Sequence, residues 1–142
     1  MLKNIPSILS PDLLKIIMEM GHGDEIVVAD GNFPSASVAQ RLVRLDGHAI
    51  PEILEAMLRL FPLDTYVDRP VGLMAVMAGD PYKPVIWEEY KKIILASKEP
   101  FKEFESIERF AFYERAKKAY AVIATSESAL YANIILKKGV VV

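Results

Sequence analysis

A short β-branched run, EIVVA at residues 25–29, gives the clearest structural signal in the chain, and the turn-like DGNFP follows it at residues 30–34. A continuous apolar run of this length is typical of a strand that is covered on both faces in a parallel sheet. The segment before it has apolar residues at helical spacing between Ser10, a favourable helix N-cap, and Gly21, a favourable helix stop. The pattern therefore indicates a helix, then a buried strand that ends in a turn.

The same alternation continues along the rest of the chain. We predict further strands at residues 42–45, 71–77, 120–125 and 134–136, and further helices at residues 51–61, 84–97 and 112–119. Residues 109–113 alternate in polarity, which favours a strand edge or an extended lead into the last helix. Helices that alternate with buried strands indicate a layered α/β fold with a largely parallel sheet. The sequence has no linker or repeat, so we expect one domain over residues 1–142.

The composition excludes several classes of protein. The chain has no cysteine, which excludes a disulfide scaffold, a cysteine-ligated zinc site and a thiol nucleophile. Its 17 basic and 19 acidic residues give a net charge of -2 without a basic run, which argues against a nucleic-acid partner. Apolar residues make up 52% of the chain, yet no segment approaches the ~20 residues of a membrane-spanning helix and residues 1–9 contain no secretory h-region. We therefore expect a soluble, cytoplasmic protein whose apolar surplus fills a large core and a subunit interface.

Common cofactor and nucleophile motifs do not occur in the sequence. There is no P-loop and no Gly-x-Ser-x-Gly elbow, and GHG at residues 21–23 lacks the third glycine and the preceding strand of a dinucleotide fold. The two histidines, His22 and His48, do not form the helical pair that binds zinc. The sequence therefore predicts neither a cofactor nor a metal site.

His22 and Asp30 flank the strand at residues 25–29 and are the first candidate site residues. Ligands in open α/β sheets gather beyond the carboxyl ends of strands, so Asp30 is well placed to accept a hydrogen bond from a ligand hydroxyl. An imidazole titrates near neutrality, which suits His22 to general acid–base catalysis. The structural alternative is that His22 caps a helix–strand junction and Asp30 belongs to an ordinary Asp-Gly turn.

Tyr131 and Asn133 form a second candidate pair in the segment YANIIL at residues 131–136. In an extended chain, two residues at this spacing share a face. A phenol and a carboxamide suit a polyhydroxylated ligand, because an amide both donates and accepts hydrogen bonds. The alternative is a turn that precedes the strand.

Arg109, Tyr113 and Asp64 complete the candidates. Arg109 can bind sugar hydroxyls or pair with Asp30, and Tyr113 offers a phenolic donor. Asp64 lies in PLDTY at residues 62–66, a segment that suits either a hydroxyl-binding carboxylate or a helix-exit turn.

Three motifs occur in a characteristic order: GHGD at residues 21–24 leading to Asp30, RFAFYER at residues 109–115, and YANIIL at residues 131–136. Together they resemble the RbsD/FucU family of sugar mutarotases, in particular its L-fucose mutarotase branch. The similarity runs from residue 2 to residue 140. Ribose pyranase relatives share the first and last motifs but lack the RFAFYER block, so that block distinguishes the fucose branch.

The resemblance implies a three-layer α/β/α fold of the RbsD type, with a largely parallel, mixed sheet. It implies an isomerase that interconverts the α and β anomers of L-fucose without a cofactor. It also implies a homo-oligomer, commonly a decamer built from two pentameric rings, with the sites at subunit boundaries.

The resemblance also assigns roles to the candidate residues. It implies that His22 is the proton-donating catalytic residue. The sugar-binding residues that it implies are Asp30, Arg109, Tyr131 and Asn133, with Tyr113 and Asp64 at further sugar-contacting positions.

Ring opening of a pyranose needs a base at the anomeric hydroxyl and an acid at the ring oxygen. His22 is the candidate proton carrier, and Asp30 and Tyr113 are both candidates for the complementary role. Three alternative functions remain at this point: a pyranase or mutarotase for ribose or another aldose, a non-catalytic sugar-binding regulatory protein, and a metal-dependent hydrolase.

Overall fold

The computed structural model describes residues 1–142 as six strands and five helices. The strands are β1 (Glu25–Ala29), β2 (Leu42–Leu45), β3 (Val71–Met74), β4 (Glu105–Ile107), β5 (Ala121–Thr125) and β6 (Ile134–Lys137). The helices are α1 (Pro11–Glu19), α2 (Ser35–Val38), α3 (Ile50–Leu58), α4 (Ile86–Ser97) and α5 (Arg109–Lys118). The predicted helix and strand before Asp30 are confirmed, with Ser10 Oγ accepting a hydrogen bond from the Leu13 N–H at the start of α1.

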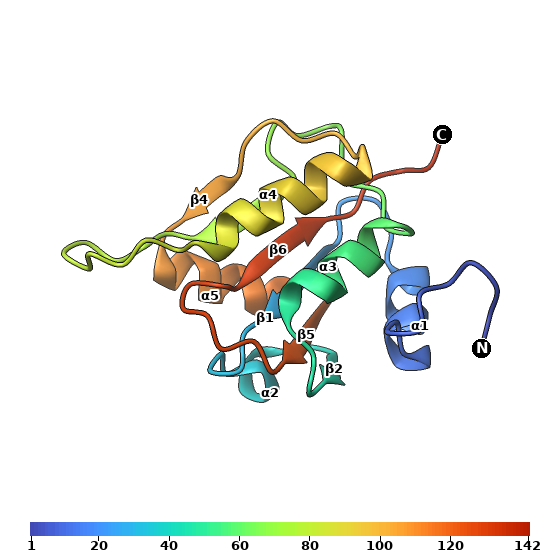
Figure 1. Ribbon diagram of the computed structural model, residues 1–142, viewed down its shortest axis with the longest axis horizontal. Helices are drawn as coiled ribbons and strands as arrows, with labels where there is room; N and C mark the ends of the chain where they lie inside the picture. Colours follow the sequence, from blue (N-terminus) through green and yellow to red (C-terminus); the bar gives the residue numbers. More distant parts are fainter.

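All six strands belong to one sheet in the order β2-β5-β1-β6-β3-β4. Strand β1 runs parallel to β5, and β5 runs parallel to β2. Strand β6 is antiparallel to both of its neighbours, β1 and β3, while β3 and β4 are parallel. Figure 1 shows β6 crossing the centre of the molecule towards the end where the two termini lie. The predicted mixed and largely parallel sheet is confirmed, with β6 as the one reversed strand.

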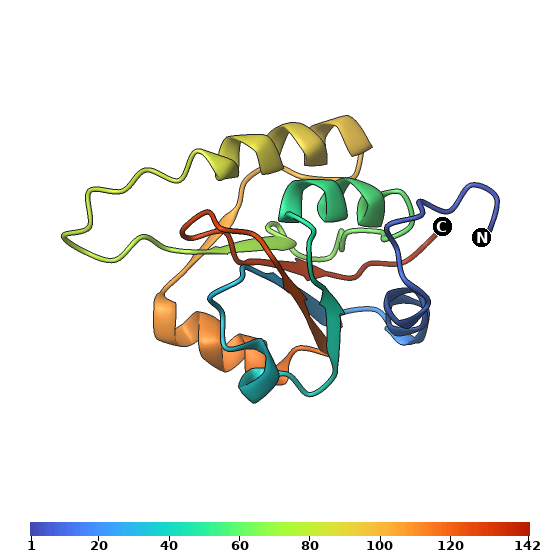
Figure 2. The same ribbon diagram turned by 60° about the horizontal axis from the view of Figure 1, so that its bottom comes forward.

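Helices cover both faces of the sheet, which confirms the three-layer arrangement. Figure 2 shows α3 and α4 on one side of the sheet and α2 and α5 on the other. Strand β1 faces both layers because successive side chains alternate between the faces of a strand. Ile26 and Val28 belong to the core beneath α3 and α4, whereas Val27 and Ala29 pack in a smaller core with Phe112 of α5. This burial on both faces explains why the sequence of β1 is apolar without interruption.

Helix α5 differs from the prediction. We predicted an extended segment at residues 109–113, but the helix begins at Arg109, so that prediction was wrong. The Glu108 carboxylate accepts hydrogen bonds from the N–H groups of Phe110 and Ala111 and so caps the helix. Glutamate is not among the common N-cap residues, and the sequence therefore carries no ordinary signal for this start.

Other elements also differ from the sequence analysis, and helix α3 ends at Leu58 rather than at the predicted residue 61. Strand β3 ends at Met74, three residues before the predicted end, and the chain then enters a long loop towards α4. Strand β4 and helix α2 were not predicted, because three residues are too few for an alternating strand pattern and four residues make only about one helical turn. No helix in this fold is long and apolar enough to cross a membrane.

Helix α4 provides a matched test of the packing. Ile94 is fully buried against the larger core, whereas its neighbour Leu95 is exposed. We expect Ile94→Ala to lower the free energy of unfolding by about 2–5 kcal/mol, because it removes buried methyl groups and leaves a cavity. Leu95→Ala should change it by less than about 0.5 kcal/mol. Denaturant unfolding of the two variants measures both values, and equal losses would contradict the burial assigned to α4.

Candidate active site

The reversed direction of β6 brings two distant segments of the chain together at one edge of the sheet. Val28, near the end of β1, pairs with Ile134, the first residue of β6. The residues just after β1 therefore lie beside the residues just before β6. The Asp30 N–H donates a 2.7 Å hydrogen bond to Asn133 Oδ1 across this junction. The Asn133 amide oxygen is thus already bound to the backbone N–H of Asp30.

A hollow of about 320 Å³ opens at this junction. Five of the seven candidate residues line it: Asp30, Arg109, Tyr113, Tyr131 and Asn133. The other lining residues are Asn32, Phe33, Met74, Met77, Asp80 and Leu130. The lining combines aromatic and apolar side chains with a few convergent polar groups, which is the usual character of a small-molecule site.

Asp30 is almost completely buried, with 8% of its surface exposed. Its Oδ1 accepts a 3.0 Å hydrogen bond from the Asn32 N–H, which holds the carboxylate in a tight turn. Burial raises the pKa of Asp30 above its ordinary value of 3.8, and the nearby Glu127 carboxylate raises it further. A carboxylate with a raised pKa is a better proton acceptor at neutral pH than an exposed one, which suits acid–base work.

Arg109 and Tyr113 reach the hollow from the first turns of α5. They are four residues apart, so the helix places them on one face. The Tyr113 ring stacks on Phe33 with centroids 5.4 Å apart, and the Arg109 guanidinium lies 5.8 Å from the Tyr113 ring. Arg109 Nη1 contacts Met77 Sδ at 3.3 Å and has no carboxylate partner, so the suggested pair with Asp30 does not form. The guanidinium is therefore available to a ligand.

Tyr131 enters the hollow from a left-handed backbone, with a φ of 56°. The expectation that an extended chain places Tyr131 and Asn133 on one face does not hold, because this φ is not extended. Both side chains line the hollow nonetheless. The Tyr131 carbonyl accepts a 2.8 Å hydrogen bond from Trp87 Nε1, and the Tyr131 hydroxyl donates a 2.6 Å bond to Asp80 Oδ2. The sequence analysis missed Asp80, because GDP at residues 79–81 has the composition of an ordinary turn.

His22 and Asp64 lie elsewhere in the chain. His22 precedes β1, and Asp30 follows it, so a five-residue strand of about 16 Å separates them along the sheet. Asp64 lies at the same edge as His22, where its N–H donates to the Lys137 carbonyl at the end of β6. His22 Nε2 is 3.0 Å from Asp64 Oδ1, and the ring of Tyr66 packs 5.0 Å from the imidazole. Within one chain, these two residues form a separate cluster.

The environments of His22 and Asp64 differ. Asp64 is 3% exposed, and the side chain of His22 is 42% exposed. Burial favours the protonated form of Asp64, but hydrogen bonds from the Tyr66 N–H and from His22 outweigh it and lower the pKa of the carboxyl. An ionised carboxylate on Nε2 orients the ring and leaves Nδ1 free for another partner.

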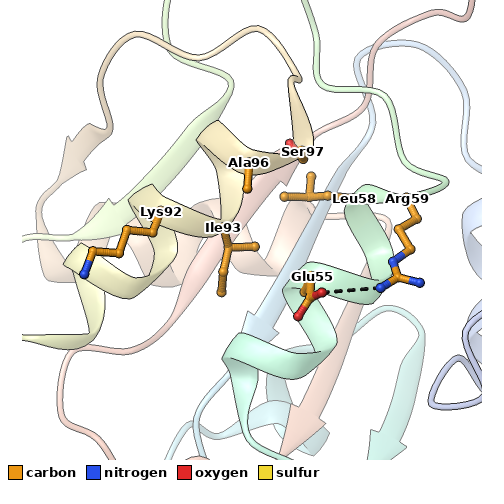
Figure 3. Close-up of a pocket in the computed structure, with 7 residues that line it drawn as sticks. All are labelled: Glu55, Leu58, Arg59, Lys92, Ile93, Ala96 and Ser97. Atoms are coloured by element: carbon orange, nitrogen blue, oxygen red, sulfur yellow. Dashed lines mark hydrogen bonds and ion pairs between the residues drawn. The ribbon is translucent and has the colours of Figure 1, made fainter.

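A larger hollow of about 520 Å³ lies between α3 and α4 and contains none of the candidate residues. Figure 3 shows Arg59 paired with Glu55 there and Lys92 pointing away from the groove. Volume alone therefore does not identify the site, because the convergent polar groups lie in the smaller hollow. No group of three or more histidine, aspartate or glutamate side chains is arranged to hold a metal ion.

The sequence profile of the RbsD / FucU transport protein family matches residues 3–141. The chain belongs to this family. It is 53% identical to the fucose mutarotase of Mus musculus in an alignment 144 residues long, which covers 97% of this chain and 94% of the mouse protein. The resemblance inferred from the three motifs is therefore confirmed over almost the whole chain.

Solved structures show the same relationship. The fucose mutarotase of Streptococcus pneumoniae, crystallised in complex with L-fucose, is 57% identical, with a TM-score of 0.95 over 99% of this chain and 100% of that chain. The RbsD protein of Bacillus subtilis, complexed with D-ribose, is 26% identical, with a TM-score of 0.74 over the full length of both chains. The chain is thus more similar to the fucose protein than to the ribose protein in both sequence and structure.

The raised pKa of Asp30 predicts how the free energy of unfolding depends on pH. This pKa is higher in the folded protein than in the unfolded chain, so the folded state binds more protons at pH values between the two pKa values. The folded state therefore loses stability as the pH rises from the unfolded pKa to the folded pKa. We expect Asp30→Asn to increase the free energy of unfolding at pH 7 and to lose this advantage below pH 3.8, where the carboxyl is protonated in both states. Denaturant unfolding at the two pH values measures the difference. The exposed Asp68 provides the control, since Asp68→Asn should show no such pH-dependent gain.

Proposed function

We propose that the chain is an L-fucose mutarotase, an isomerase that interconverts the α and β anomers of L-fucose by acid–base catalysis without a cofactor. The observation that carries the proposal is the hollow at the junction of β1 and β6, where a buried carboxylate, a free guanidinium, two phenols and a carboxamide converge. The relatives named fucose mutarotase support the choice of sugar. We assign the activity to one domain over residues 1–142.

The charge of the hollow suits an uncharged, hydroxyl-rich ligand. Its lining contains the carboxylates of Asp30 and Asp80 and the guanidinium of Arg109. Carboxylates accept hydrogen bonds from sugar hydroxyls, and a guanidinium donates them. The Asn133 amide adds a donor and an acceptor, so the lining of the hollow can form hydrogen bonds of both kinds with neighbouring sugar hydroxyls. A phosphate or carboxylate on the sugar would meet two negative charges there.

The reaction requires two proton transfers. A base removes the proton of the anomeric hydroxyl while an acid protonates the ring oxygen, the C1–O5 bond breaks, and an open-chain aldehyde forms. Rotation about C1–C2 and closure on the other carbonyl face return both protons and give the other anomer. Each positioned proton transfer typically contributes about 10²–10⁴-fold, which suffices for a reaction that already proceeds in water.

We assign the two transfers as follows. Asp30, whose pKa is raised by burial, and Tyr113, whose ring is fixed by its stack on Phe33, are the candidates for the base at the anomeric hydroxyl. Arg109 stabilises negative charge that develops on the anomeric oxygen. Tyr131 and Asn133 bind the remaining hydroxyls. His22 is the proton donor to the ring oxygen, held by Asp64.

The proposed role of His22 requires a second copy of the chain. Within one chain, His22 and Asp64 lie at the edge of the sheet opposite to the hollow. A neighbouring copy that turns this edge towards the hollow supplies the missing proton donor. Such a contact joins different surfaces of the two copies, and heterologous contacts of this kind form a ring when the rotation between successive copies closes. The separation of the two clusters thus supports a ring-like homo-oligomer, and we propose that it is a decamer, as the family resemblance implies.

Exposed apolar surface gives independent support for assembly. Leu2, Met18, Leu60 and Val141 line a hollow of about 420 Å³ where the two termini meet. Apolar patches with several large side chains often mark contacts with another protein chain. We propose a cytoplasmic location for this assembly.

The proposed activity is tested by saturation-transfer NMR at the anomeric protons of a small panel of sugars. We expect the protein to accelerate exchange between the anomers of L-fucose, and His22→Ala to lower the catalysed rate about 100-fold, since it removes one positioned proton transfer. The exposed His48 provides a matched control, because His48→Ala should retain full activity.

Other outcomes of this experiment assign other functions. Acceleration with D-ribose or another aldose, but not with L-fucose, would identify a mutarotase of different specificity. Saturable L-fucose binding with no change in exchange rate would identify a non-catalytic sugar-binding protein. Activity that is lost on chelation would indicate a metal enzyme.

The shared site is tested by mixing two inactive variants. Neither His22→Ala nor Arg109→Ala should be active alone, but in a randomly mixed assembly about a quarter of the contacts pair an intact His22 with an intact Arg109. We therefore expect co-refolded variants to recover about a quarter of the wild-type rate. No recovery would place the complete site within one chain. Light scattering of the wild type provides the second readout, and a mass near 15.9 kDa at micromolar concentration would refute the assembly.

A further inference from the structure

The loop between β3 and α4, residues 75–85, projects beyond the sheet beside the start of β6, as Figure 2 shows. Met77 and Asp80 of this loop line the hollow. Met77 Sδ contacts the Arg109 guanidinium, and Asp80 Oδ2 accepts the hydrogen bond from the Tyr131 hydroxyl. One loop therefore touches two of the proposed sugar-binding side chains, although the sequence analysis assigned it no role.

Asp80 is held in place by its own loop. Gly79 has a φ of 85°, a conformation that favours glycine, and the turn closes with a 3.0 Å hydrogen bond from the Asp80 N–H to the Met77 carbonyl. Asp80 Oδ1 accepts a 2.9 Å bond from the Tyr82 N–H. The Tyr82 ring stacks on Tyr131, with centroids 5.9 Å apart. These contacts leave Asp80 Oδ2 facing the Tyr131 hydroxyl.

The bond to Asp80 determines what the Tyr131 hydroxyl offers to a ligand. A phenol has one proton to donate and also accepts hydrogen bonds. The proton of Tyr131 is committed to Asp80 at 2.6 Å, and the Met77 N–H donates to the same oxygen at 3.4 Å. The remaining capacity of this oxygen is that of an acceptor. A sugar hydroxyl that contacts Tyr131 must therefore donate its proton.

We propose that Asp80 is a positioning residue that holds the Tyr131 hydroxyl as a hydrogen-bond acceptor for one sugar hydroxyl, and so sets part of the sugar specificity. The inference rests on the proposed function, because it gives Asp80 a role in the same site. The contact with Asp80 also raises the pKa of the Tyr131 phenol, since ionisation would place a second negative charge beside the carboxylate. The phenol thus stays protonated and directed towards the loop.

The test compares Asp80→Asn with Glu88→Gln. The asparagine keeps an oxygen for the Tyr82 N–H but presents an N–H₂ group to Tyr131, which reverses the hydrogen bond and frees the phenolic proton. We expect the KM for L-fucose to rise about tenfold with kcat changed by less than about twofold, because a binding contact is lost equally in the ground and transition states. Glu88 is an exposed acid in the first turn of α4, and Glu88→Gln removes the same charge without touching the hollow. Its KM should equal that of the wild type.

A second measurement reports on Tyr131 without turnover. In protein labelled with ¹³C at tyrosine Cζ, Tyr131→Phe identifies the Tyr131 resonance, and a pH titration gives the pKa of its phenol. We expect Asp80→Asn to lower this pKa relative to the wild type and Glu88→Gln to leave it unchanged. An unchanged pKa in Asp80→Asn would overturn the proposed contact.

The double variant Asp80→Asn with Tyr131→Phe shows whether Asp80 acts through Tyr131. If it does, the double variant has the same KM as Tyr131→Phe alone. A KM in which the two single effects multiply would overturn the positioning role, as would an Asp80→Asn variant with the wild-type KM. A wild-type protein that does not accelerate L-fucose exchange would instead contradict the proposed function, so the two failures are distinguishable.

Discussion

The antiparallel pairing of β6 with β1 is the constraint on which the site depends. Because β6 runs against β1, the residues that precede β6 meet the residues that follow β1, and the Asp30–Asn133 hydrogen bond of 2.7 Å closes the junction. In a fully parallel sheet, residues 131–133 would lie at the edge occupied by His22, far from Asp30. The single reversed strand thus gathers the carboxylate, the amide and the Tyr131 phenol around one hollow. Helix α5 then needs only its first two turns to add Arg109 and Tyr113.

This arrangement has a thermodynamic cost at Asp30. The carboxylate is buried at the end of a central strand, and both burial and the Glu127 carboxylate disfavour its ionised form. Hydrogen bonds from the backbone N–H groups of Asn32 and Phe33 offset part of this cost without removing it. A group that destabilises the folded state while facing a hollow is typical of a functional site, where proton affinity rather than stability determines the residue.

The two clusters at opposite edges of the sheet connect the fold to the proposed assembly. His22 and Asp64 form an oriented imidazole–carboxylate pair at one edge, and the hollow with its free guanidinium lies at the other. In the mechanism that we propose, neither edge is sufficient, and the contact between neighbouring copies joins them. The apolar surplus of the composition, 52% of the chain, fills the two cores around the sheet, and in the proposed assembly its remainder would cover the contacts between copies.

Periodicity and motif order in the sequence by themselves determined the layered α/β fold, the family and the candidate residues, since buried strands and amphipathic helices leave local patterns. The start of α5 escaped prediction because Glu108 is an uncommon cap, and Asp80 escaped because a turn residue carries no sign of a partner 51 positions away. Only the tertiary structure decided which candidates meet: it placed five in one hollow and paired His22 with Asp64 at the opposite edge. The reason is that proximity depends on the direction of β6 and on the order of strands in the sheet, and both are set by packing between segments that are far apart in the chain.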